Sequence, residues 1–185
     1  RLILLVIKYL ELSILFMSFI SLFPTLGAFV LFLYIIAVLL HLFFIKKEKL
    51  FISLISVYTA FLLLVIVPIF SPTILNWLSI HPYIRAGVFA ILCIVLFIIL
   101  SFSNFNWFSK KTSPTKFITS LIYRKAIVGL FFTTILYFFP ETLKVKFGNV
   151  VYWLFMNLIA MIIWFIIPLF LAFAYRFKTR RGWIE

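Results

Sequence analysis

The stretch Phe44-Ile45-Lys46-Lys47-Glu48-Lys49-Leu50-Phe51 separates two long runs of uncharged residues. The run before it is Leu26–Ile45 and the run after it is Leu50–Phe70, and neither contains an acidic residue, a lysine or an arginine. A helix of about 20 apolar residues, rising about 1.5 Å per residue, crosses a hydrocarbon core of about 30 Å. The two runs are therefore predicted to form a transmembrane hairpin with the charged stretch at its tip.

The composition of the whole chain also indicates a membrane protein. Of its 185 residues, 66% are hydrophobic and only 11% are charged, and the mean hydropathy is +1.29. Because a soluble domain carries about 25% charged residues, this chain has too little polar surface to cover a water-soluble core. We predict the all-α class: a single polytopic transmembrane helical bundle over residues 1–185.

Six spans are predicted from the apolar runs, with a basic tail at residues 176–185. Their ranges are 2–22, 26–45, 50–70, 84–103, 117–139 and 150–175. The first run contains Lys8 and Glu11 and is followed by Pro24, so it either crosses or lies partly in the interface, which leaves five spans as the alternative. Pro168 is predicted to kink the last span.

The basic residues gather on one side of this topology. With six spans, fourteen of the seventeen lysines and arginines fall on the side of the two termini, and only Arg85, Lys144 and Lys146 on the other. By the positive-inside rule both termini are expected in the cytoplasm, and we expect a bacterial inner-membrane protein. The expected cytoplasmic anchors, beside anionic headgroups, are Lys46, Lys47, Lys49, Lys110, Lys111, Lys116, Arg180 and Arg181. This clustering explains the net charge of +13 without nucleic-acid binding.

Polar residues inside the runs are the candidate functional groups, because charges in hydrocarbon are costly. Glu11 either faces the bundle as a proton or cation site or pairs with Lys8 at interface depth. Asn157 either contacts a substrate or makes a hydrogen bond between helices. His41 is interpreted as an interfacial anchor. Arg124 is expected to extend back to the headgroups from a surface-lying first turn of its helix.

Small residues at helical spacing indicate close helix packing in two runs. Ser53, Ser56 and Ala60 recur on one face of the third run, and Ala86 and Ala90 form a small-xxx-small pair in the fourth. These five residues are the predicted helix-packing positions.

Residues 32–70 resemble the opening hairpin of the colicin V production protein family. The matching residues are Lys46-Lys47-Glu48-Lys49 and the following Leu50-Phe51-Ile52-Ser53-Leu54-Ile55-Ser56. The glycine that the family has beside its basic turn is absent here, and an extra run precedes the hairpin. The resemblance implies a small inner-membrane protein linked to export of a peptide toxin, and it assigns no catalytic residue.

No HExxH, GxSxG, P-loop or GxGxxG sequence occurs in the chain, and Cys93 is its single cysteine. No metal, cofactor or catalytic residue is predicted. We predict a non-enzymatic accessory or scaffold subunit of a membrane assembly that contacts other membrane subunits or itself. The alternatives are a small transporter or channel-like protein and, less favoured, a lipid-modifying enzyme.

Overall fold

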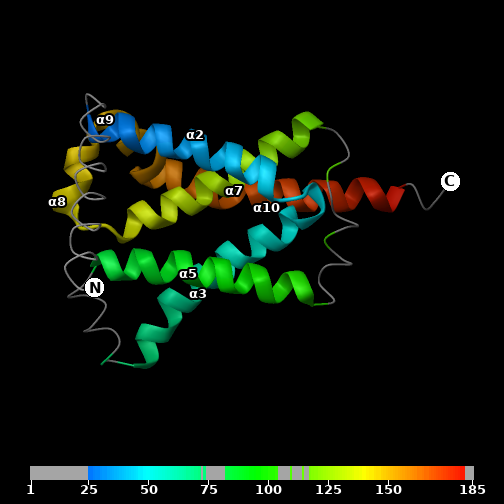
Figure 1. Ribbon diagram of the computed structural model, residues 1–185, viewed down its shortest axis with the longest axis horizontal. Helices are drawn as coiled ribbons and strands as arrows, with labels where there is room; N and C mark the ends of the chain where they lie inside the picture. Colours follow the sequence, from blue (N-terminus) through cyan, green and yellow to red (C-terminus); the bar gives the residue numbers. More distant parts are fainter. Residues whose placement is uncertain are drawn as a thin grey trace, which may run out of the picture.

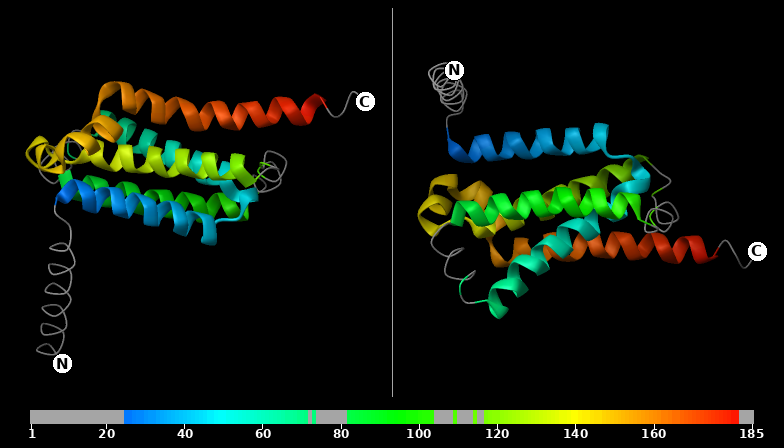
Figure 2. Two further views of the ribbon diagram at one scale, coloured as in Figure 1. Left: turned by 90° about the horizontal axis from the view of Figure 1, so that it is seen from above. Right: turned by 60° about the horizontal axis from the view of Figure 1, so that its bottom comes forward.

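The computed structural model describes residues 25–71, 73, 82–103, 109, 114 and 117–181. Within these residues the chain is helical and contains no strand. The long helices lie side by side, and α3 crosses the others obliquely (Figures 1 and 2). The predicted all-helical fold is therefore confirmed for the part of the chain that is described.

The predicted hairpin is present. Helix α2 (Leu26–Phe44) begins at Thr25, whose Oγ1 accepts a hydrogen bond from the Ala28 N–H at 3.1 Å. A 3₁₀ turn, η1 (Lys47–Lys49), follows, and α3 (Leu50–Phe70) starts directly after it. The charged stretch is thus a tight turn between two apolar helices, as its sequence predicts.

Two further long helices follow, within two residues of the predicted boundaries. Helix α5 (Pro82–Phe102) begins at a proline, which is favoured at a helix start because its missing N–H would have no partner there. Helix α7 (Phe117–Phe138) ends just before Pro140.

Four helices, namely α2, α3, α5 and α7, are long and apolar enough to cross a membrane, and a bent helix pair at the end of the chain raises the number to five. The predicted first span, 2–22, with Lys8 and Glu11, lies outside the described residues. The structure therefore supports a helical membrane protein with four or five candidate spans.

The predicted last span, 150–175, is broken at Asn157 instead of only kinked at Pro168. Residues 141–157 form α8 (Glu141–Lys144), η2 (Val145–Phe147), α9 (Gly148–Val151) and η3 (Tyr152–Met156, a π-helical turn). The chain then bends by 44° before α10 (Leu158–Arg181). The break lies at Asn157, whose ψ of 142° is extended. Pro168, the predicted kink, lies inside α10.

Helix α7 occupies the centre of the bundle and packs on α2, α3, α5 and α10. It is the most buried of the four long helices and also the least apolar. Both properties have one cause, since polar side chains within a bilayer are placed toward the protein interior. The buried polar residues of α7 are Ser120, Arg124, Thr133 and Thr134. The expected surface-lying first turn is wrong, because α7 is one helix and Arg124 is buried.

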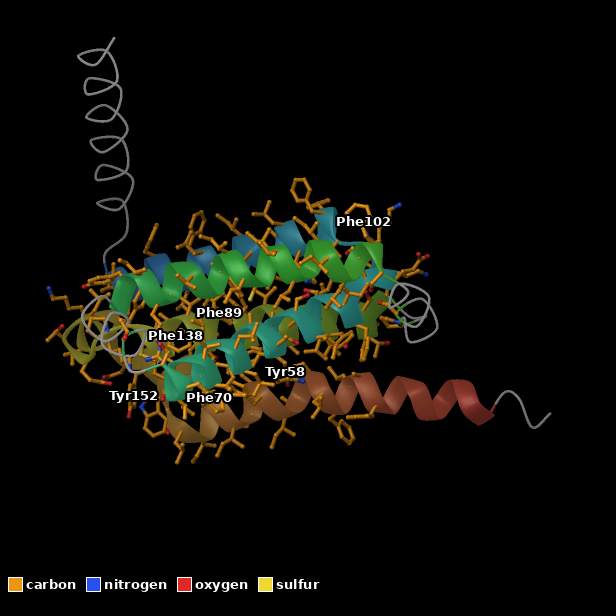
Figure 3. All side chains as sticks on the ribbon, turned by 90° about the horizontal axis from the view of Figure 1, so that it is seen from below. Tyr58, Phe70, Phe89, Phe102, Phe138 and Tyr152 are labelled. Carbon is orange, nitrogen blue, oxygen red and sulfur yellow. The ribbon has the colours of Figure 1, made fainter. Side chains whose placement is uncertain are left out.

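Aromatic side chains fill the contacts around α7. Phe89 of α5 and Phe138 of α7 meet edge to face, with ring centroids 5.9 Å apart (Figure 3). Tyr58 of α3 donates its hydroxyl hydrogen to the Phe165 carbonyl of α10, one turn before Pro168. This bond joins α3 to the last helix.

Candidate functional site

Among the described residues, Arg124 is the one charged side chain that is buried, with only 4% of its surface exposed. Its Nη1 donates to the carbonyl of Ile45 at 2.6 Å and to the carbonyl of His41. Its Nε lies 3.4 Å from Ser120 Oγ, one turn earlier on α7. The carbonyls at a helix C-terminus lack helical partners and carry partial negative charge. Arg124 therefore caps the C-terminal end of α2 with a positive charge from a different helix.

His41 joins this cap to α3. Its Nε2 lies 3.1 Å from Ser53 Oγ, and its Nδ1 lies 3.5 Å from Arg124 Nη1. Arginine has hydrogen-bond donors and no acceptor, so the nearby cation favours the tautomer with a lone pair on Nδ1. The ring proton is then on Nε2 and is donated to Ser53. The interpretation of His41 as an interfacial anchor stays a prediction, and the structure adds that its ring is engaged by two other helices.

This arrangement cannot activate Ser53 as a nucleophile. In a serine–histidine pair the imidazole accepts the hydroxyl proton, and a carboxylate at the other nitrogen holds that tautomer. Here the group at Nδ1 is a guanidinium, which selects the opposite tautomer. The cluster of His41, Ser53 and Arg124 is therefore suited to holding three helices together rather than to acyl transfer.

A serine-reactive probe tests this inference. The protein in mild detergent, treated with an alkyl fluorophosphonate, should incorporate no more probe than its Ser53→Ala variant. Labelling of the wild-type chain that disappears in Ser53→Ala would contradict the tautomer assigned to His41. A purified serine hydrolase in the same detergent is the positive control.

Next to this cluster lies a cavity of about 260 Å³ between α2, α3, α5 and α7. Its walls are Ala37, His41, Ile45, Ser53, Ser56, Val57, Cys93, Ile94, Phe97, Ile127, Val128 and Phe131. The histidine and serine side chains in the wall have partners within the protein. His41 and Ser53 bond to each other, and Ser56 Oγ donates to the Ile52 carbonyl at 2.8 Å. The cavity consequently presents an almost wholly apolar surface.

The predicted packing positions lie mainly in the interior. Ser53, Ser56, Ala60 and Ala86 are buried, while Ala90 is half-buried. The first three face the centre of the bundle from α3, which packs most extensively on α5. Two of the five, Ser53 and Ser56, also line the cavity.

Asn157 has a local role rather than the predicted bond between helices. Its Oδ1 lies 3.4 Å from the Ile159 N–H, and its own N–H bonds to the Tyr152 carbonyl at 2.8 Å. The indole of Trp164 donates to the Leu154 carbonyl at 2.7 Å. Side chains thus satisfy backbone groups that the break in the helix releases.

The basic anchors are described only in part. Lys46 and Lys47 are exposed at the hairpin tip, and Lys49 Nζ lies 5.9 Å from the centroid of the Phe97 ring. Arg180 and Arg181 lie in the last turn of α10. Lys110, Lys111 and Lys116 lie outside the described residues. Among the residues described, no group of three or more histidine, cysteine or acidic side chains is placed to hold a metal ion.

Comparison with known proteins does not assign the chain to a family. No protein-family model, curated protein or solved structure matches the chain. The resemblance of residues 32–70 to the colicin V production family therefore stays a prediction.

The sequence did carry a signal for the buried cluster. Arg124 and His41 are polar residues placed about two turns and one turn inside apolar runs, at the ends that the topology puts on the same side. Charge cost alone predicts that such residues face protein. What the sequence does not reveal is that the partner of Arg124 is a helix end rather than a carboxylate.

Proposed function

We propose that this protein is a non-enzymatic scaffold or accessory subunit of a membrane assembly. The observation that carries the proposal is the use of the buried polar cluster: Arg124, His41 and Ser53 join α7, α2 and α3 to one another. Because these polar groups bond to one another and to the backbone, they hold the helices in place and are not available to react with a substrate.

The C-terminal part of α10 supplies a contact surface for a partner. The helix continues to Arg181 and extends past the other helices at the end of the bundle where α2 and α5 also end (Figures 1 and 2). Its sequence there contains Arg176, Lys178, Arg180 and Arg181. We assign this end to the cytoplasm because of its basic charge, and a basic helix that projects from the bundle suits an acidic surface on a partner subunit.

Co-purification from the native membrane in mild detergent tests the proposal. The wild-type chain should migrate as a complex with a partner at fixed stoichiometry, and the double variant Arg180→Gln, Arg181→Gln should lose about tenfold or more of that partner, because opposed charges across an interface are strongly coupled. The matched control is Lys144→Gln, Lys146→Gln at the other end of the bundle, which should retain it. A wild-type chain that purifies as a stable monomer would overturn the proposal.

The broken helix at Asn157 is the observation that favours a transporter or channel. Discontinuous helices in transporters direct free backbone groups at their ions and substrates. Here Asn157 and Trp164 already bond to backbone groups of the break. Because those bonds already occupy backbone groups at the break, the break is better explained as a structural bend than as a binding site. The scaffold is therefore the better-supported function.

A further inference from the structure

We propose that the cavity between α2, α3, α5 and α7 binds one acyl chain of an anionic phospholipid, with the headgroup at Lys49. The cavity is lined almost entirely by apolar atoms, and its histidine and serine side chains bond within the protein. A polar substrate would find no free partner there apart from the Cys93 thiol. A hydrocarbon chain has no polar group that would need a partner in the cavity.

The size of the cavity fits the part of a single chain that lies nearest the headgroup. Ala37 of α2 and Ile45, the residue directly after α2, both line it, so it extends about 12 Å along the helix axis. That length is most of one leaflet of a hydrocarbon core of about 30 Å. A volume of about 260 Å³ lies below the roughly 300–1,000 Å³ of pockets for drug-sized ligands.

The cavity has access from the bilayer. Ile94 of α5 lines it and is also 61% exposed on the outside of the bundle. In a chain that spans a membrane, a side chain exposed on this part of a long apolar helix faces lipid. Helix α2 packs on α7, η2 and α9, whereas its packing against α3 and α5 is sparse. A chain can therefore enter sideways between α2 and α5 without unfolding of the bundle.

The charge at the basic end of the cavity selects the headgroup. Phe97, a wall residue, lies under Lys49 Nζ, and Ile45, another wall residue, directly precedes the exposed Lys46 and Lys47. Glu48 lies within the same turn, so the turn carries three positive charges and one negative charge. This net positive charge favours a headgroup whose phosphate is not neutralised by a positively charged group in the same lipid. Phosphatidylglycerol should therefore bind better than phosphatidylcholine.

Native mass spectrometry of the full-length protein in mild detergent tests the site. With equal amounts of phosphatidylglycerol and phosphatidylcholine of the same acyl composition, one phospholipid should remain per chain, with phosphatidylglycerol preferred. Lys49→Gln should reduce that preference by about fivefold, the factor expected for one lysine near an anionic headgroup. Lys146→Gln, an exposed lysine at the other end of the bundle, should leave the preference unchanged.

A second pair of variants tests the cavity itself. Ala37→Phe fills it and should abolish retention of either lipid, whereas Ile35→Phe, at a position of α2 that is 57% exposed, should retain it. No retained phospholipid in the wild type, equal retention of the two lipids, or unchanged retention by Ala37→Phe would each overturn the proposal.

The wild-type chain provides an independent measurement should Ala37→Phe fail to fold. Cys93 is the single cysteine and lines the cavity. At ten times the dissociation constant of phosphatidylglycerol, about one cavity in ten is empty, so alkylation of Cys93 by an apolar maleimide should slow about tenfold. Phosphatidylcholine at the same concentration should protect it less. Equal alkylation rates with and without phosphatidylglycerol would overturn the proposal.

Discussion

Arg124→Met should lower the thermal unfolding midpoint in detergent by about 6–12 °C. Methionine keeps the apolar stem of the side chain but is shorter and lacks the donors that bond to the carbonyls of His41 and Ile45. A hydrogen bond to a charged group contributes about 1.5–3 kcal/mol, and a buried carbonyl left without a donor carries a further cost. Because Ile45 N–H still bonds to the His41 carbonyl, we expect a net loss of about 3 kcal/mol, which gives the stated shift for a chain of this size.

The neighbouring residue is the matched control. Lys125 is exposed on the same helix, so Lys125→Met removes one positive charge without removing an internal bond and should change the midpoint little. Arg124→Lys should lie between the two, because one ammonium group cannot reproduce the planar fork of a guanidinium. Circular dichroism of all four proteins at one detergent concentration makes the comparison. Equal midpoints for Arg124→Met and Lys125→Met would show that the cap does not stabilise α2.

The long uncharged runs were sufficient to predict the helices that they form. The hairpin of α2 and α3 follows from two apolar runs and a charged turn, and the observed boundaries differ from the predicted ones by no more than one residue. Length and hydropathy are the quantities that the bilayer selects, so the local sequence contains this information.

The break at Asn157 was not predictable in the same way. Asn157 is one polar residue in a run that is otherwise apolar, and Pro168 is the stronger local signal for a bend. The break depends on tertiary partners, since Trp164 of α10 bonds to the Leu154 carbonyl and stacks on Phe155, with centroids 5.8 Å apart and planes 15° apart. The site was not predictable from the local sequence either, because Arg124, His41 and Ser53 come from three helices.

Gly129→Ala is expected to destabilise the bundle by about 2 kcal/mol, although alanine favours a helix by about 1 kcal/mol over glycine. A Cβ at Gly129 of α7 would overlap Cζ3 and Cε3 of Trp164. The indole cannot turn away freely, because its Nε1 bonds to the Leu154 carbonyl and its ring stacks on Phe155. Helix α10 must therefore move away from α7.

The control is the same substitution in α5. Gly87 has no atom within 4 Å of the position that a Cβ would take, so Gly87→Ala should leave stability unchanged or raise it by up to about 1 kcal/mol. Unfolding by a denaturing detergent, followed by circular dichroism, gives both free energies. Two alanine variants with the same effect would contradict the close approach of α7 and α10.

A double variant separates the steric clash from any other effect of the alanine. Trp164→Phe removes the larger ring together with its bond to the Leu154 carbonyl, so alone it should be destabilising. In its presence Gly129→Ala should cost less than it does in the wild type, with a coupling of about 1 kcal/mol or more between the two sites. Simple additivity would mean that Trp164 is not what excludes a side chain at Gly129. The sign of this coupling therefore tests the contact that joins the central helix to the helix beyond the break.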